Sequence, residues 1–134
     1  MIPIATDRTA KKRVLIVDDD VSITRILKVA LERTGDYEVR EEHQGLRALE
    51  AAEQFQPDVI VLDVCMPDRD GGDVAFQFRA HRQFKRLPIV FLTSLVSEQD
   101  AADGALRACG GFRFLPKTVS LEDLQDCLQE VMGV

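Results

Sequence analysis

The sequence contains little cysteine, few aromatic residues and no long apolar run. It has three cysteines, one tyrosine and no tryptophan in 134 residues. Cys65, Cys109 and Cys127 form no Cys-x-x-Cys pair, so they indicate neither a disulfide framework nor a zinc site. No apolar stretch approaches the ~20 residues that span a bilayer, and the N-terminus lacks the apolar core of a signal peptide. We therefore expect a cytoplasmic chain that does not enter a membrane.

Basic residues are also fewer than acidic residues. The chain carries 23 acidic and 17 basic residues, which give a net charge of −6. This balance argues against direct binding of nucleic acid by the chain as a whole. A hydrophobic content of 46% excludes intrinsic disorder, and the length suits a single domain. We expect a polar leader over residues 1–12 and one domain over residues 13–132, with no room for a second domain.

Apolar residues alternate between strand-like and helix-like spacing along the chain. Continuous apolar runs predict buried strands at residues 13–17, 59–62, 88–92 and 112–115, and a weaker strand is expected at 37–40. Helical spacing predicts helices around residues 23–31, 46–52, 71–78 and 102–109, and a last helix that follows Ser120 as its N-cap. Five strand–helix repeats of this kind predict an α/β domain, a doubly wound (βα)5 fold with a parallel five-stranded sheet.

Polar side chains gather where four of the predicted strands end. They are Asp18, Asp19 and Asp20 after the first strand, Asp63 after the third, Thr93 after the fourth and Lys117 after the fifth. Ligands of such sheets bind at this edge. Carboxylates at close range repel one another unless a cation neutralises them, and hard oxygen ligands suit Mg²⁺. A hydroxyl and an ammonium group facing the metal can hold phosphoryl oxygens, so the pattern predicts a phosphoryl group on a carboxylate.

Four motifs, each at a strand end, connect this pattern with a known family. They are Val17-Asp18-Asp19-Asp20, the stretch from Leu62 to Gly71, Leu92-Thr93-Ser94 and Leu115-Pro116-Lys117. Through them the chain resembles the receiver domain of two-component response regulators over roughly residues 12–132, and it looks like a stand-alone, chemotaxis-regulator-like member. The resemblance implies a flavodoxin-like receiver fold. It also implies a signalling phosphoacceptor, not an enzyme, whose only catalysis is its own phosphorylation and dephosphorylation.

The resemblance also implies a role for each site residue. Asp63 matches the phosphoacceptor. The groups that match the Mg²⁺ ligands are Asp18, Asp19, Asp63 and the backbone carbonyl of Cys65. Thr93 matches the switch hydroxyl, Lys117 matches the phosphoryl-binding lysine and Phe114 matches the aromatic switch residue. The phosphoryl donor would be a histidine kinase or a phosphotransfer protein. A downstream protein would read the face formed by the fourth helix, the fifth strand and the fifth helix, with a homodimer as a further option.

Two positions depart from the usual receiver pattern. Thr118 follows Lys117, where receivers usually have a proline, often after a cis peptide bond. A cis bond before a residue other than proline costs ~2.5–4 kcal/mol, so we expect a trans bond and a more mobile loop. Phe114 stands where tyrosine is common, so its ring can be buried without a hydroxyl hydrogen bond. Phe114 can equally be an ordinary core residue, and Asp20 can serve as a helix N-cap and not as a metal ligand.

Two other functions compete with a phosphorylated receiver. Asp18-Asp19-Asp20-Val21-Ser22 resembles the DxDx(T/S) opening of haloacid dehalogenase phosphatases, with Asp18 as nucleophile and Asp20 as acid/base. That family offers no counterpart for the stretch from Asp63 to Pro67, and the chain lacks its cap domain and its late acidic pair. The other alternative is a degenerate receiver that acts as a constitutive interaction module, which the intact acidic site disfavours.

Overall fold

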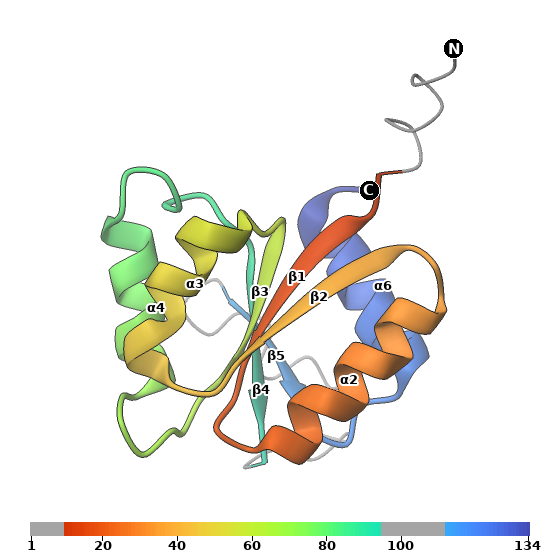
Figure 1. Cartoon of the computed structure of the whole chain (residues 1–134), viewed down its shortest axis with the longest axis horizontal. Helices are drawn as coiled ribbons and strands as arrows, with labels where there is room; N and C mark the ends of the chain where they lie inside the picture. The colour runs from red at the N-terminus through yellow and green to blue at the C-terminus, as the bar shows by residue number, and fades with distance from the viewer. Residues whose placement is uncertain (1–9, 95–111) are drawn as a thin grey trace.

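A single parallel sheet of five strands forms the centre of the molecule (Figure 1). The structure is a computed structural model and describes residues 10–94 and 112–134. The strands are β1 (Lys12–Val17), β2 (Tyr37–Glu42), β3 (Val59–Asp63), β4 (Ile89–Thr93) and β5 (Arg113–Pro116). They lie in the order β2-β1-β3-β4-β5, and every neighbouring pair is parallel. The predicted α/β fold with a doubly wound sheet is confirmed.

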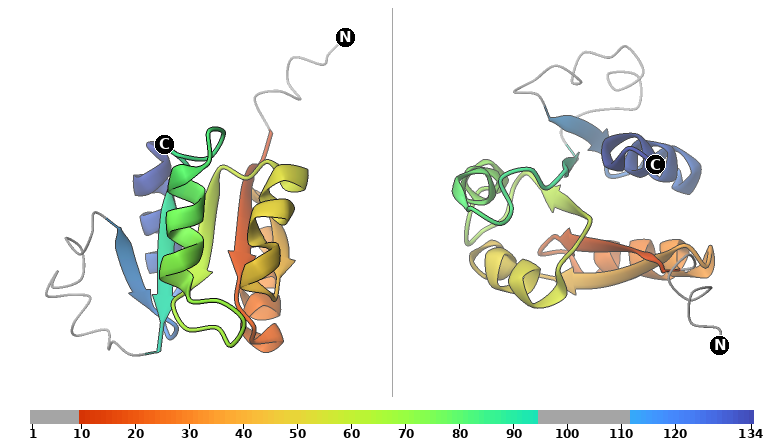
Figure 2. Two further views of the ribbon diagram at one scale, coloured as in Figure 1. Left: turned by 90° about the vertical axis from the view of Figure 1, so that its left-hand side faces the viewer. Right: turned by 90° about the horizontal axis from the view of Figure 1, so that it is seen from above.

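Helices cover both faces of the sheet. They are α2 (Val21–Arg33), a short 3₁₀ helix η1 (Gly45–Arg47), α3 (Ala48–Phe55), α4 (Gly71–Ala80) and α6 (Leu121–Met132). Helices α3 and α4 pack on one face, and α2 and α6 pack on the other (Figures 1 and 2). The helix predicted around residues 102–109 lies outside the described residues.

The two cores explain why β1 and β3 are apolar at almost every position. Successive side chains of a strand point to opposite faces. In β1, Leu15 and Val17 belong to the core beneath α3 and α4, whereas Val14 and Ile16 belong to the core beneath α2 and α6. All four residues are fully buried. A continuous apolar run is therefore required, as in other parallel sheets that are covered on both sides.

Side chains cap the helices where the sequence placed their starts. The Asp20 carboxylate accepts from the Ser22 N–H at 2.9 Å, and the Ser120 hydroxyl accepts from the Asp123 N–H at 3.1 Å. These bonds satisfy backbone donors that the first helical turn leaves free. Both predicted caps are thus confirmed, Asp20 as the cap of α2 and Ser120 as the cap of α6.

Strand β2 is longer than the sequence predicted. The prediction ended it at Arg40, but the strand continues to Glu42, and Glu41 and Glu42 pair in register with Ile16 and Val17. The physical reason is the position of β2 at the edge of the sheet, where these side chains remain partly exposed. Charged residues therefore do not end an edge strand as they would end a central one. The remaining strand limits differ from prediction by one residue, as is usual at element ends.

Candidate functional site

The sheet topology opens the C-terminal edge between β1 and β3. The connection from β1 leads into α2 on one face, and the connection from β3 leads into α4 on the other (Figure 1). Such a switch point leaves a crevice where ligands bind in open parallel sheets. Asp18 follows β1 directly, and Asp63 is the last residue of β3. The N–H of Asp18 donates to the Glu42 carbonyl at 3.0 Å, which fixes the start of the loop after β1.

Three carboxylates meet at this edge. Asp18, Asp19 and Asp63 each offer an oxygen, and these oxygens all lie within 4.8 Å of one another. Asp18 is 1% exposed and Asp63 is 3% exposed, whereas Asp19 faces solvent. One oxygen of Asp18 accepts from the Asp20 N–H at 2.9 Å, so this buried carboxylate is held in place. The cluster therefore combines two buried acids with one that solvent can reach.

A lysine from the end of the chain's last strand closes the cluster. The Lys117 Nζ lies 3.0 Å from Asp18 Oδ2 and 3.2 Å from Asp63 Oδ1. The Lys117 N–H donates to the Thr93 carbonyl at 3.0 Å and thereby ties the loop after β5 to the end of β4. The Lys117–Thr118 bond is trans, as expected, since the described residues contain no cis peptide bond. The missing proline therefore does not keep the ammonium group away from the acids.

Burial and charge perturb the ionisation of this cluster. Burial, followed by the charge of Asp18, raises the pKa of Asp63 to about 6, although Lys117 opposes the shift. Burial alone would lower the pKa of Lys117, but its contacts with Asp18 and Asp63 outweigh burial and raise that pKa. Lys117 thus remains charged at neutral pH and offsets part of the negative charge of the two buried acids.

Two buried oxygens of the cluster, Asp18 Oδ2 and Asp63 Oδ2, accept no hydrogen bond from the described residues, but Asp18 Oδ2 lies 3.0 Å from the Lys117 ammonium, whereas the ion pair of Asp63 with Lys117 uses Oδ1. Asp63 Oδ2 is buried and accepts no hydrogen bond from residues 10–94 or 112–134. A buried carboxylate oxygen without a donor or a cation is costly, so its presence favours a ligand at that position. The surrounding donors are hard carboxylate oxygens, the type that Mg²⁺ prefers. Asp18, Asp19 and Asp63 therefore fit a divalent cation, which would offset the negative charge that Lys117 leaves unbalanced in the cluster.

The two predicted switch residues lie on neighbouring strands. Thr93 ends β4, is 4% exposed and pairs in register with Pro116, next to Lys117. Phe114, in β5, is half-buried and stacks on Phe91, with ring centroids 4.9 Å apart. Phe91 also receives the edge of Phe112 at 5.2 Å. The structure therefore brings Thr93 to the acidic edge and places Phe114 in an aromatic cluster on the face that α4 covers.

Gly71 shapes the site, although its spacing in the sequence indicated only a helix start. Its N–H donates to the Val64 carbonyl at 2.8 Å, so the loop after β3 folds back onto the strand end. A Cβ at this position would lie 2.2 Å from the carbonyl oxygen of Asp63 and 2.9 Å from the Cα of Val64. Only glycine permits this approach, and any side chain would displace the backbone that carries Asp63.

Asp68 is a second positioning residue that the sequence did not reveal. Its carboxylate accepts from the Gly45 N–H at 3.1 Å and from the Leu46 N–H at 2.9 Å. These bonds, above all the bond from Leu46, lower the pKa of Asp68. They attach the loop between β3 and α4 to η1, which is distant in the sequence, so no local pattern could have predicted them.

Comparison with known proteins decides the family. The family model described as the response regulator receiver domain matches residues 14–129 of the chain. This chain belongs to that family. The receiver interpretation and the flavodoxin-like fold are confirmed, and the phosphatase alternative loses its support.

Curated relatives agree with this assignment. The chain is 43% identical over 93 residues to the alkaline phosphatase synthesis transcriptional regulatory protein PhoP of Bacillus subtilis, covering 69% of this chain and 38% of that protein. It is 37% identical over 118 residues to the transcriptional regulatory protein PdtaR of Mycobacterium tuberculosis, covering 88% of this chain and 55% of that protein. The chain thus spans about two-fifths to just over half the length of these two relatives.

Solved structures match nearly the whole chain. The chemotaxis protein CheY4 of Vibrio cholerae is 35% identical with a TM-score of 0.76, covering 91% of this chain and 99% of that chain. The receiver domain of the sensor histidine kinase PA1611 of Pseudomonas aeruginosa PAO1 is 28% identical with a TM-score of 0.77, covering 93% and 100%. A magnesium ion is coordinated in the active site cleft of the PA1611 domain. In the part of this chain that the structure describes, no helix has the length and apolar character needed to cross a membrane.

Proposed function

We propose that the chain receives a phosphoryl group on Asp63 from a histidine kinase or a phosphotransfer protein. The observation that carries this proposal is the buried Asp63 Oδ2, which has no partner among the described residues and belongs to the carboxylate contacted by Lys117. An oxygen without a hydrogen bond is free to attack phosphorus. As the new O–P bond forms, the bond between phosphorus and the donor breaks, and its electron pair leaves with the donor. Asp63, whose pKa is about 6, is mainly ionised at neutral pH and can act as this nucleophile.

Asp18, Asp19, Asp63 and the backbone carbonyl of Cys65 are the groups that would hold Mg²⁺. The three carboxylates fit because their oxygens already lie within 4.8 Å of one another. When bound, the ion offsets the negative charge shared by the acceptor and the phosphoryl oxygens. The Asp20 N–H keeps Asp18 oriented toward the cluster, and the exposed Asp19 is the ligand most accessible to a hydrated ion.

Lys117 and Thr93 are the groups that would hold the phosphoryl oxygens. The aspartyl phosphate adds a charge of ~−2 to a buried edge and needs donors nearby. The Lys117 ammonium lies 3.2 Å from Asp63 Oδ1 and can follow the charge from the carboxylate to the phosphoryl group. Thr93, buried at the end of β4, can donate its hydroxyl proton to a second phosphoryl oxygen.

The response to phosphorylation would pass through Phe114. Movement of Thr93 toward the phosphoryl group changes the packing at the ends of β4 and β5, where Phe114 stacks on Phe91. A local change of charge would thereby bias the packing of the face that includes β5 and α6. A downstream protein would read that face, or a second copy of the chain would pair through it. We place these events in the cytoplasm, with catalysis limited to the chain's own phosphorylation and dephosphorylation.

A crystal structure with Mg²⁺ and beryllofluoride, a mimic of the phosphoryl group, tests these roles. We expect the mimic on Asp63, with the Thr93 hydroxyl and the Lys117 ammonium in contact with its fluorines. The Asp63→Asn variant is the matched control and should leave the mimic unbound. Lys117 turned toward solvent, or the mimic on Asp18, would contradict the assignment.

A further inference from the structure

A basic loop, residues 81–86, joins α4 to β4 at the end of α4 remote from the acidic site. Arg82, Lys85 and Arg86 are exposed and form no ion pair with the described residues. Some other exposed arginines are paired, such as Arg13 with Glu38 and Arg25 with Glu41. No acidic residue occurs in the sequence between Asp73 and Glu98, although the chain has a net charge of −6. The basic loop is therefore a local reversal of the chain's overall charge.

The basic loop is anchored to the core by the buried side chain of Phe84. Phe84 is 4% exposed, stacks on the His81 ring at 5.0 Å and lies 5.6 Å from the Phe78 ring. The Phe84 N–H donates to the His81 carbonyl at 3.1 Å, and the Leu87 N–H donates to the Phe84 carbonyl at 3.0 Å. Since Phe84 is fixed in the core, the three cations are presented outward on an ordered turn. Preorganisation of this kind lowers the entropic cost of binding a partner.

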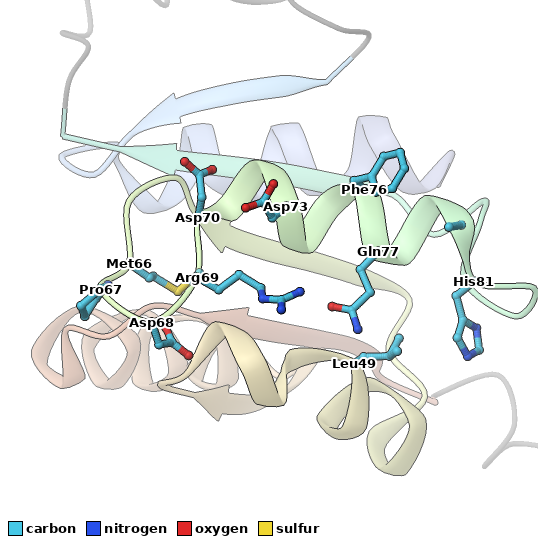
Figure 3. Close-up of a pocket in the computed structure, with 11 residues that line it drawn as sticks. Leu49, Met66, Pro67, Asp68, Arg69, Asp70, Asp73, Phe76, Gln77 and His81 are labelled. Carbon is cyan, nitrogen blue, oxygen red and sulfur yellow. The ribbon is translucent and has the colours of Figure 1, made fainter.

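A groove between α3 and α4 leads to this loop (Figure 3). It has a volume of about 890 Å³, and its lining includes Leu49, Phe76 and His81, the first residue of the basic loop. Phe76 is 76% exposed, which is unusual for so large an apolar side chain. Arg69 extends into the groove beside Gln77 and forms no ion pair with a described carboxylate (Figure 3). The groove thus offers apolar contact and one unpaired guanidinium.

The two ends of the groove differ in charge. Asp68, Asp70 and Asp73 line the end at the start of α4, whereas the basic loop follows the other end. Asp68 and Asp70 accept backbone hydrogen bonds there, but Asp73 is exposed and forms no ion pair within residues 10–94 or 112–134. An occupant with a negative end and an apolar middle is complementary to this surface in one orientation only.

We propose that the groove and the basic loop together bind an acidic segment of a partner protein that also carries apolar side chains. Its carboxylates would lie on Arg82, Lys85 and Arg86, and its apolar side chains would pack against Leu49 and Phe76. A nucleic acid or an anionic membrane is disfavoured, because the net charge of −6 repels an extended polyanion whereas three cations on one turn match a short acidic run. The basic loop lies one helix length, ~15 Å, from the start of α4 and the acidic site, so its contacts with the partner do not require phosphorylation of Asp63.

Fluorescence anisotropy with the full chain tests this surface. The probe is a fluorescein-labelled peptide in which a run of glutamates precedes a pair of leucines. We expect it to bind the wild type, and the triple variant Arg82→Glu, Lys85→Glu, Arg86→Glu to bind it roughly tenfold more weakly, since each exposed pair contributes little. Phe76→Ser should weaken binding without changing its dependence on salt.

The matched control is Lys11→Glu, Lys12→Glu, Arg33→Glu, which reverses three other exposed cations that have no ion-pair partner in the described part of the chain. Equal weakening in the two triple variants would mean that only net charge matters and would overturn the proposal. No binding of the peptide to the wild type, or tighter binding of duplex DNA or phosphatidylglycerol vesicles, would overturn it as well. Phosphorylation by acetyl phosphate, measured on the same samples, should be unchanged in every variant. A failure of phosphorylation alone would count against the role of Asp63 and not against this surface.

Discussion

Replacing Asp63 with asparagine should stabilise the folded chain at neutral pH when Mg²⁺ is absent. Burial and then the neighbouring Asp18 raise the pKa of Asp63 from 3.8 to about 6, which means that its ionised form is disfavoured in the fold. A shift of ~2 units at ~1.36 kcal/mol per unit amounts to ~3 kcal/mol of lost stability once Asp63 is ionised. Asparagine has nearly the same shape and no charge. The pKa of about 6 already includes the opposing contact with Lys117, so we expect a gain in the free energy of unfolding of up to ~3 kcal/mol.

The gain should depend on pH in a defined direction. Below the unfolded pKa of 3.8, Asp63 is protonated in both states and the shift has no effect on stability. As pH rises toward 6, the unfolded chain loses this proton first, so the wild type loses stability until the folded carboxyl has also ionised. The difference between variant and wild type should therefore be complete above the folded pKa and shrink as pH falls toward the unfolded pKa.

Urea unfolding followed by circular dichroism, with EDTA present, measures this difference. The natural pair of conditions is a pH of ~7.5 and a pH of ~5, on either side of the folded pKa. Asp20→Asn is the matched control, because Asp20 is exposed and asparagine can still cap α2. Its effect on the free energy of unfolding should be smaller than that of Asp63→Asn, because both aspartate and asparagine cap helices well. Equal or lower stability of Asp63→Asn at neutral pH, or a difference that does not change with pH, would refute the electrostatic reasoning.

Three further predictions concern the residues around Asp63. Millimolar Mg²⁺ should raise the melting temperature of the wild type, since the ion binds the carboxylates assembled in the folded chain and not those dispersed in the unfolded chain. The rise should be much smaller for Asp19→Asn, and equal rises would show that Asp19 is not a principal ligand. Lys117→Ala should impair phosphorylation by acetyl phosphate. Mg²⁺ binding, measured by titration calorimetry, should stay intact or become stronger, because the substitution removes a competing cation from Asp18 and Asp63. Loss of Mg²⁺ binding would contradict this division of roles. Gly71→Ala should lower the free energy of unfolding, measured in the same urea assay, by ~1–3 kcal/mol, since its Cβ would lie 2.2 Å from a carbonyl oxygen. Gly72→Ala is the control and should lower it less, because its Cβ would meet only a carboxylate oxygen at 3.1 Å.

The order of the elements could be predicted from the sequence, because strands that are buried on both faces of a parallel sheet appear as continuous apolar runs. Val14 to Val17 and Val59 to Leu62 are apolar at every position, since each strand serves both cores. The acidic cluster was also predictable, because residues at the ends of parallel strands share one edge. Strand β2 was underestimated for the opposite reason. Its place at the edge of the sheet lets Glu41 and Glu42 pair while remaining partly exposed.

Contacts between segments that are distant in the sequence could not be predicted, because no local sequence pattern indicates them. The approach of Gly71 to the Asp63 carbonyl and the bonds from Asp68 to Gly45 and Leu46 depend on how loops fold against one another. The sequence predicted Lys117 at the acidic edge, but its distances of 3.0 Å to Asp18 and 3.2 Å to Asp63 depend on the backbone after β5. The perturbed pKa of Asp63 likewise arises from burial and from neighbours that are remote in the chain.

The most direct test of the account is to locate the phosphoryl group. The wild type is treated with acetyl phosphate and Mg²⁺, the acyl phosphate is reduced with borohydride, and the modified residue is identified by mass spectrometry of peptides. We expect modification of Asp63 alone, and none in the Asp63→Asn variant. Modification of Asp18, or an unmodified Asp63 in a chain that binds Mg²⁺, would contradict it.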